Sequence, residues 1–284
     1  MIRNFASTFH RVAAALTLLA GLAHAASTAH PTKAAGADGP AYADKKTQRL
    51  VERMLERHGG LSAWRALPSI RYEHEMLDPS NPADPWISIE AHDPRTRRTY
   101  HTWPRDEARI GYDGTRCWSV GWKRQNPPKM MATVSFFFLN LPWITQDAGV
   151  RLEAVGSREV PKISEERAMT AVRMTWPEGN PHEYYELYID PRTNVLRGVA
   201  YTVVDPTLLK LFAPSGDVKF LGPLLKVYVD HEEHAGLLFP TRYDTYRNGN
   251  AYGVHWARAW SMDEPFDESE LEMPEGASVD RSGS

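Results

Sequence analysis

The chain has 284 residues, of which 42% are hydrophobic and 24% charged, and this composition is typical of a globular protein rather than of a disordered chain. Its formal net charge of −3 at pH 7 argues against a nucleic-acid-binding protein, which would carry a basic surface. The single cysteine, Cys117, excludes an intramolecular disulfide and any zinc or iron–sulfur site built from several cysteines.

Residues 1–25 have the pattern of a secretory signal peptide. Two arginines and no acidic residue precede the end of an apolar stretch at 12–22, and Ala23-His24-Ala25 forms an A-x-A cleavage site. That stretch is well short of the ~20 residues needed to span a bilayer. We therefore expect cleavage before Ala26, a periplasmic mature protein with no stable membrane span, and a flexible spacer over 26–40.

The first periodic segment after the spacer predicts an amphipathic helix over 44–58, with Asp44 as its N-cap. A second, shorter helical turn is expected over 61–67 and is closed by Pro68. The pattern then changes to a period of two residues, which places every second side chain on the same face of a strand.

Strand patterns recur from residue 70 to residue 261, separated by turn signals such as Asp-Gly and Asp-Pro. One pair is joined by Asn248-Gly249, which predicts a hairpin with a type I′ turn. Because little helix intervenes, the pattern predicts a mainly β (α+β) fold built as an antiparallel meander. The expected strands are 70–76, 86–92, 97–103, 108–112, 116–120, 151–155, 168–176, 183–189, 195–204, 218–229, 238–247 and 251–261.

The segment 130–144 breaks the strand pattern because it is apolar throughout and contains three consecutive phenylalanines. As a strand it would place aromatic rings on both faces, so we expect a short helix that Pro142 ends and that lies across the sheet. More leucines follow in the region 206–223, which is expected to be a loop. Two interpretations of this apolar excess stay open: a core between sheet and helices, or the lining of a cavity for an acyl chain.

The sequence contains no clear catalytic motif. The chain has no G-x-S-x-G serine and no glycine-rich phosphate loop. The stretch His231-Glu232-Glu233-His234 lacks the H-E-x-x-H spacing of a zinc site, and a charged turn after a strand ending at Val229 explains it better. Cys117 is expected to be an inert, buried residue. We therefore expect no catalytic residue, no metal and no cofactor.

Four short stretches resemble elements of a known family, in the same order and at similar spacing. Residues 111–118 resemble the "DG-x-x-x-W" hairpin, and 187–196 the "l-x-iD-x-x-T-x-l" strand–turn–strand, of the LolA/LolB-like outer-membrane lipoprotein carrier superfamily. Residues 58–64 and 240–243 are similar to elements of uncharacterised secreted relatives. The resemblance implies an open antiparallel β-barrel of about eleven strands wrapped around a helical lid, with an apolar cavity that carries lipid or acyl chains through the periplasm.

The leading hypothesis is a non-catalytic periplasmic carrier or sensor whose partners are lipid or lipoprotein acyl chains. The expected mature chain comprises the spacer, one half-barrel domain over 41–270 whose barrel is preceded by the N-terminal helix described above, and a disordered tail over 271–284. One alternative is a secreted hydrolase with a site assembled around His74, His92, His101 and His231. Another is an envelope module that binds a protein partner. The residues expected to line the cavity or its entrance are Trp118, Phe136, Phe137, Phe138, Leu139, Leu141 and Trp143.

Overall fold

One curved sheet of fourteen strands organises the part of the chain that the computed structural model describes, residues 39–163, 167–177, 179–213 and 218–281. The signal peptide and nearly all of the spacer expected from the sequence lie outside these residues. The strands are β1 (Ala41–Tyr42), β2 (Ile70–Leu77), β3 (Trp86–His92), β4 (Thr99–Trp103), β5 (Ala108–Tyr112), β6 (Cys117–Val120), β7 (Arg151–Arg158), β8 (Met169–Thr175), β9 (Tyr185–Ile189), β10 (Leu196–Val203), β11 (Leu221–His234), β12 (Leu237–Arg247), β13 (Asn250–Ser261) and β14 (Ser278–Asp280). The helices are α1 (Lys45–Arg57), α2 (Leu61–Ala66), α3 (Pro128–Leu139), α4 (Leu141–Ile144) and α5 (Pro206–Phe212), with the 3-10 turns η1 (Pro104–Asp106) and η2 (Glu268–Leu271).

The strand order is β1-β7-β8-β9-β10-β11-β12-β13-β2-β3-β4-β5-β6-β14. Apart from the short parallel pair of β1 with β7, the neighbouring strands are antiparallel. Two meanders, β7 to β13 and β2 to β6, meet where β13 pairs with β2. The sheet does not close on itself, so the predicted open, mainly β architecture is confirmed. Each of the twelve predicted strand segments is a strand, and β1 and β14 are additional.

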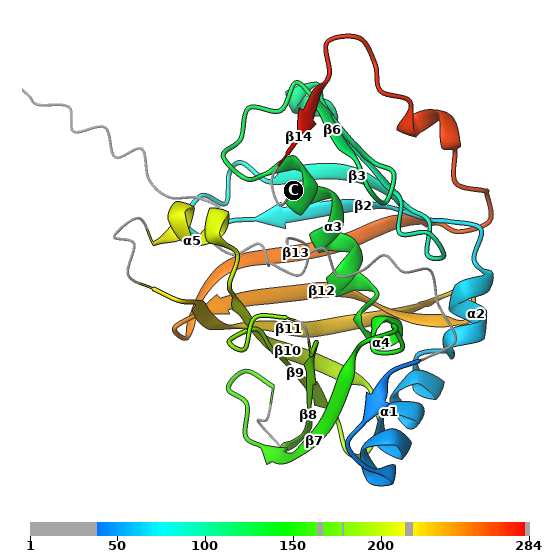
Figure 1. Ribbon diagram of the computed structural model, residues 1–284, viewed down its shortest axis with the longest axis vertical. Helices are drawn as coiled ribbons and strands as arrows, with labels where there is room; N and C mark the ends of the chain where they lie inside the picture. Colours follow the sequence, from blue (N-terminus) through cyan, green and yellow to red (C-terminus); the bar gives the residue numbers. More distant parts are fainter. Residues whose placement is uncertain (1–38, 164–166, 178, 214–217, 282–284) are drawn as a thin grey trace, which may run out of the picture.

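The connection from β6 to β7 covers one face of the sheet. It contains α3 and α4, which lie across the sheet between its two ends (Figure 1). This inner face and the helices enclose the main hydrophobic core, to which α1 and α2 also contribute. The predicted helical cover is therefore present. Among the described residues, no helix is long and apolar enough to cross a membrane.

Local sequence signals explain the helix at the start of the domain and the late hairpin. The Asp44 side chain accepts a hydrogen bond from the backbone N–H of Thr47 at 2.6 Å and so caps α1. The helix buries an apolar stripe that includes Val51 and Met54, both fully buried. In the hairpin between β12 and β13, Asn248 and Gly249 have φ values of 50° and 77°, as a type I′ turn requires.

Two expectations about helices are wrong. Pro142 does not end α3; the helix ends at Leu139, and Pro142 lies in the first turn of α4, where its missing N–H costs nothing. The region 206–223 is not simply a loop, because α5 begins it. Pro206 again occupies the first turn, and the Asp205 carboxylate accepts hydrogen bonds from two backbone N–H groups there.

Two expectations about irregular segments are also corrected. The residues from His231 to His234 are not a turn after the strand, since β11 continues to His234 and pairs with β12; the turn comes at Ala235 and Gly236, both with positive φ. Part of the tail expected to be disordered forms β14, which pairs with β6. The Asp280 carboxylate there accepts a hydrogen bond from the backbone of Lys129 at 2.7 Å, which ties the C-terminal segment to α3.

Candidate functional site

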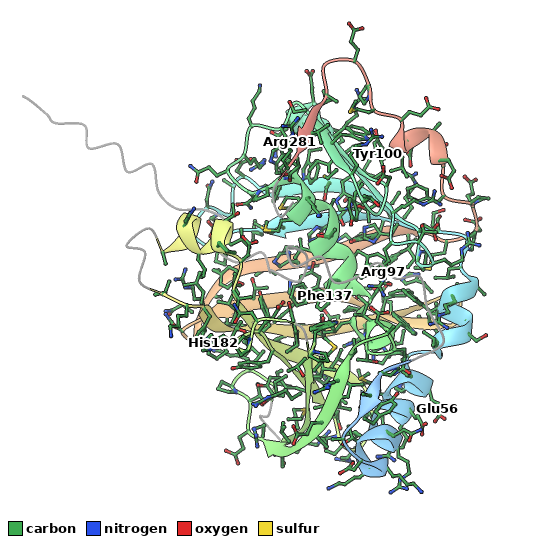
Figure 2. All side chains as sticks on the ribbon, viewed as in Figure 1. Glu56, Arg97, Tyr100, Phe137, His182 and Arg281 are labelled. Carbon is green, nitrogen blue, oxygen red and sulfur yellow. The ribbon has the colours of Figure 1, made fainter. Side chains whose placement is uncertain are left out.

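Six of the seven residues predicted to line a cavity lie on α3 and α4, and they pack as core. None is more than 6% exposed, and all six belong to one cluster with the inner face of the sheet. The ring centroids of Phe137 and of Tyr185 on β9 lie 5.0 Å apart, and Trp143 stacks on Trp64 with centroids 5.8 Å apart. Figure 2 shows Phe137 on α3, in front of the middle of the sheet. Their role as ligand contacts stays a prediction.

Trp118 is separated from these six residues. Strand side chains alternate between faces, and its neighbour Cys117 belongs to the core on the inner face. The Trp118 indole donates from Nε1 to the backbone carbonyl of Leu271 at 3.0 Å, so the C-terminal segment covers it. Gly111 makes room for the ring, because a Cβ there would come within 2.5 Å of it.

A group of polar side chains is buried where α3 crosses β2, β3, β4 and β13, and we call it the Glu90 cluster. Its centre is Glu90 on β3, which is 1% exposed. Polar groups in such a place are ordinarily retained only when they are paired or serve a function. The cluster comprises Tyr72, His74, Ser88, Glu90, His92, His101, Ser135, Lys226, Tyr243 and His255.

The Glu90 carboxylate is held by surrounding donors. Its Oε1 accepts from Ser88 Oγ at 2.8 Å and from Ser135 Oγ on α3 at 3.2 Å, and lies 2.9 Å from His74 Nδ1. Its Oε2 accepts from Tyr72 Oη at 2.6 Å. Burial opposes ionisation, but the nearby histidines, including the hydrogen bond with His74, outweigh it and hold the pKa of Glu90 well below its ordinary value. Glu90 is therefore a buried carboxylate.

His92 and His101 stand beside this carboxylate without hydrogen bonds of their own. Both rings are fully buried and stack with centroids 5.3 Å apart. His92 Nε2 lies 3.4 Å from Glu90 Oε2, and His101 Nδ1 lies 3.9 Å from Glu90 Oε1. Within the described chain, none of the four ring nitrogens has a hydrogen-bond partner. Burial lowers the pKa of His101 to about 4 and lowers that of His92.

The cluster continues along the inner face toward β11. His74 Nε2 lies 3.1 Å from His255 Nδ1 and 3.1 Å from the Tyr243 hydroxyl. Beyond them, Lys226 Nζ lies 4.0 Å from the Tyr243 ring centroid and 4.5 Å from that of Phe138 on α3. Burial lowers the pKa of Lys226 well below its ordinary value. The polar cluster and the predicted apolar site therefore share a boundary at α3.

Three of the four histidines named for an assembled site come together here, and the fourth does not. His231 lies on β11 near His58, with its Nε2 3.1 Å from the Leu196 carbonyl. Sequence reasoning missed Glu90, the residue around which the others gather. The available signal was its place two residues before His92 on one strand, which puts both side chains on one face.

Comparisons with known proteins identify the fold. No family model matches the sequence, and no curated protein matches it. Among solved structures, a LolA superfamily protein from Nitrosomonas europaea matches with a TM-score of 0.50 at 10% identity, covering 80% of this chain and 97% of that one. A putative outer membrane lipoprotein-sorting protein domain from Vibrio parahaemolyticus (TM-score 0.47, 9% identity) and a DUF1329 family protein from Desulfovibrio piger (0.48, 10%) have the same coverage. The first match shows that the chain has the LolA fold, as the sequence resemblance predicts.

Proposed function

We propose that the mature protein is a non-catalytic periplasmic carrier that takes up the acyl chain of a lipid or lipoprotein between the sheet and the helices α3 and α4. The observation that carries the proposal is the apolar connection across the open sheet. It buries nine of the twelve α3 residues, phenylalanines and methionines among them, on the inner face. The LolA fold, which the chain shares with the LolA superfamily protein from Nitrosomonas europaea, supports the same class.

Binding would exchange one set of apolar contacts for another. If α3 moves outward, the rings of Tyr185 and Tyr201, which now contact Phe137 and Phe138, become available to a ligand. Each methylene buried there gains about 0.8 kcal/mol, while the helix loses contacts of similar kind. The net affinity is therefore moderate, which suits a carrier that must also release its cargo.

A reversible crosslink tests this movement. Thr99 Oγ1 on β4 donates to the Ala132 carbonyl on α3 at 2.8 Å, so a disulfide between cysteines at these two neighbouring positions would clamp α3 to the sheet. The variant is Thr99→Cys with Ala132→Cys, in a Cys117→Ser background to remove the native thiol. Disulfide formation is verified by counting free thiols before each measurement.

The delipidated mature protein is titrated with a fluorescent fatty acid and examined by native mass spectrometry with phospholipid. We expect saturable binding by the wild type and by the reduced variant, and its loss in the oxidised variant. Equal binding by both redox forms would refute entry beneath α3. The absence of uptake by every form would refute the carrier function itself.

Export is the second part of the proposal. It is supported by the signal-peptide pattern over residues 1–25. Expressed with its leader, the protein should appear in the periplasmic fraction with a mass that corresponds to cleavage before Ala26. Retention of the full-length mass in the cytoplasm would contradict it.

A further inference from the structure

The Glu90 cluster contains a set of donors that no carrier function requires. Glu90, His92 and His101 each offer a ligand atom, and these atoms all lie within 4.8 Å of one another. We propose that these three residues bind a divalent transition-metal ion of the zinc class on the inner face of β3 and β4. The inference is independent of the proposed carrier function.

The register of the neighbouring strands β3 and β4 brings these three ligand side chains together. Glu90 and His92 are two residues apart on β3, so both side chains point to the inner face. His101 is the direct cross-strand partner of Glu90 on β4, which places it beside the same carboxylate. A sheet interior holds side chains more rigidly than a loop, as a metal site needs.

Within the part of the chain that the structure describes, the ring nitrogens of His92 and His101 lack hydrogen-bond partners, and a bound ion would provide a partner for one nitrogen of each ring. Both rings are fully buried, and all four of their nitrogens lack a hydrogen-bond partner among the described residues. A buried polar atom without a hydrogen-bond partner destabilises the folded protein. Coordination by one nitrogen of each ring would remove part of this cost, and neutral imidazole is the form that binds a metal.

The distances are close to those of a coordination shell. With zinc–nitrogen and zinc–oxygen bonds of about 2.0–2.2 Å, two ligands of a tetrahedral ion are separated by about 3.4 Å. His92 Nε2 already lies 3.4 Å from Glu90 Oε2. His101 Nδ1 lies 3.9 Å from the other carboxylate oxygen, Oε1, and the three ligand atoms lie within 4.8 Å of one another, so ring movement must bring them to tetrahedral spacing. Two imidazoles among three donors favour zinc or a neighbouring transition metal over calcium or magnesium.

The surroundings orient the carboxylate as an outer shell does in metal sites. Ser88 and His74 contact Oε1, whereas Oε2 accepts from Tyr72, so Oε2 keeps capacity for a second contact. Three protein ligands leave at least one coordination position for water or another small ligand. Ser135 brings α3 into contact with Glu90, so an ion here would lie directly beneath the helix.

The test uses the whole mature protein, stripped with a chelator and then reconstituted with zinc or cobalt(II). We expect one equivalent of zinc per chain by elemental analysis, and a cobalt(II) visible spectrum with the intensity of a four- or five-coordinate site. His101→Phe and His92→Phe should each weaken binding by more than the roughly 10–100-fold that loss of an outer-shell partner costs. The matched control is His231→Gln, a partly buried histidine outside the cluster, which should bind like the wild type.

Two outcomes would overturn the proposal. The first is substoichiometric uptake by the folded wild type, which would mean that the cluster holds water or nothing. The second is binding by His101→Phe as tight as that of the wild type and of His231→Gln, which would mark the uptake as adventitious. If the cluster variants do not fold, the zinc stoichiometry and the cobalt(II) spectrum of the wild type still test the proposal, since neither measurement needs a variant.

Discussion

Acidification should destabilise this protein through His58, which follows α1. The ring is 1% exposed, and its Nδ1 lies 2.8 Å from the Leu238 carbonyl on β12. Its Nε2 accepts a hydrogen bond from the backbone N–H of Leu196 on β10, at 3.1 Å. The two contacts select the neutral tautomer with the proton on Nδ1. A second proton on Nε2 would face the Leu196 N–H.

The size of the effect follows from the pKa. Burial, with a smaller contribution from His231 and Arg57 and against the opposing hydrogen bond to Leu238, lowers the pKa of His58 from 6.5 to about 4. The unfolded chain therefore takes up a proton below pH 6.5, whereas the native chain does not until about pH 4. Stability from this group is fully present above pH 6.5 and is lost as the pH falls through that window. A shift of this size corresponds to about 3 kcal/mol.

Urea unfolding followed by tryptophan fluorescence and far-UV CD, at intervals from pH 7.5 to pH 4, measures this loss. His58→Gln should be less stable than the wild type at pH 7.5, because two buried backbone groups lose a partner. Having no imidazole, it should lose less on acidification, so its deficit should shrink by about 3 kcal/mol. The exposed His182 provides the control, since His182→Gln should follow the wild-type curve throughout.

A difference between wild type and His58→Gln that stays constant from pH 7.5 to pH 4 would refute this reasoning. It would mean that native His58 titrates like an exposed histidine. Other histidines, including the partly buried His231, are present in both proteins, so their contribution largely cancels in the difference.

Three further predictions concern stability and reactivity. Trp143→Ala should lower the unfolding free energy by about 3–5 kcal/mol, since the indole is fully buried; a loss below 1 kcal/mol in urea titrations would contradict its place in the core. Gly59→Ala should lower the unfolding free energy by about 1–3 kcal/mol more than Gly60→Ala does. Both residues have positive φ, but only at Gly59 would a Cβ meet a backbone oxygen, that of Gly236, at 2.4 Å. Equal melting temperatures of the two variants would show that the backbone near Gly236 moves to accommodate the added Cβ, and would contradict this prediction. Cys117 is 1% exposed and burial raises the pKa of its thiol, so a thiol reagent at pH 8 should react only after denaturation, and rapid labelling of the native protein would disprove this.

Local pattern was sufficient for most of the secondary structure. The alternation in 70–76 and its equivalents depends only on which side chains face the core, and turn residues such as Asn248-Gly249 set φ by themselves. Errors arose where one local signal has two meanings. Proline both ends helices and starts them, and Pro142 starts α4 rather than ending α3. A charged stretch such as 231–234 is compatible with a turn or with an exposed strand.

The sequence by itself thus determined the strands, the apolar helix that crosses them and the open mainly β fold. Only the tertiary structure decided which side chains meet. His101 lies beside Glu90 because of the register of β4 on β3, and His255 reaches His74 because β13 pairs with β2 across 181 residues of chain. Register and long-range pairing are set by the packing of the whole inner face, so no local pattern contains them. The same packing buried the six aromatic and aliphatic residues of α3 and α4, and it turned Trp118 to the opposite face.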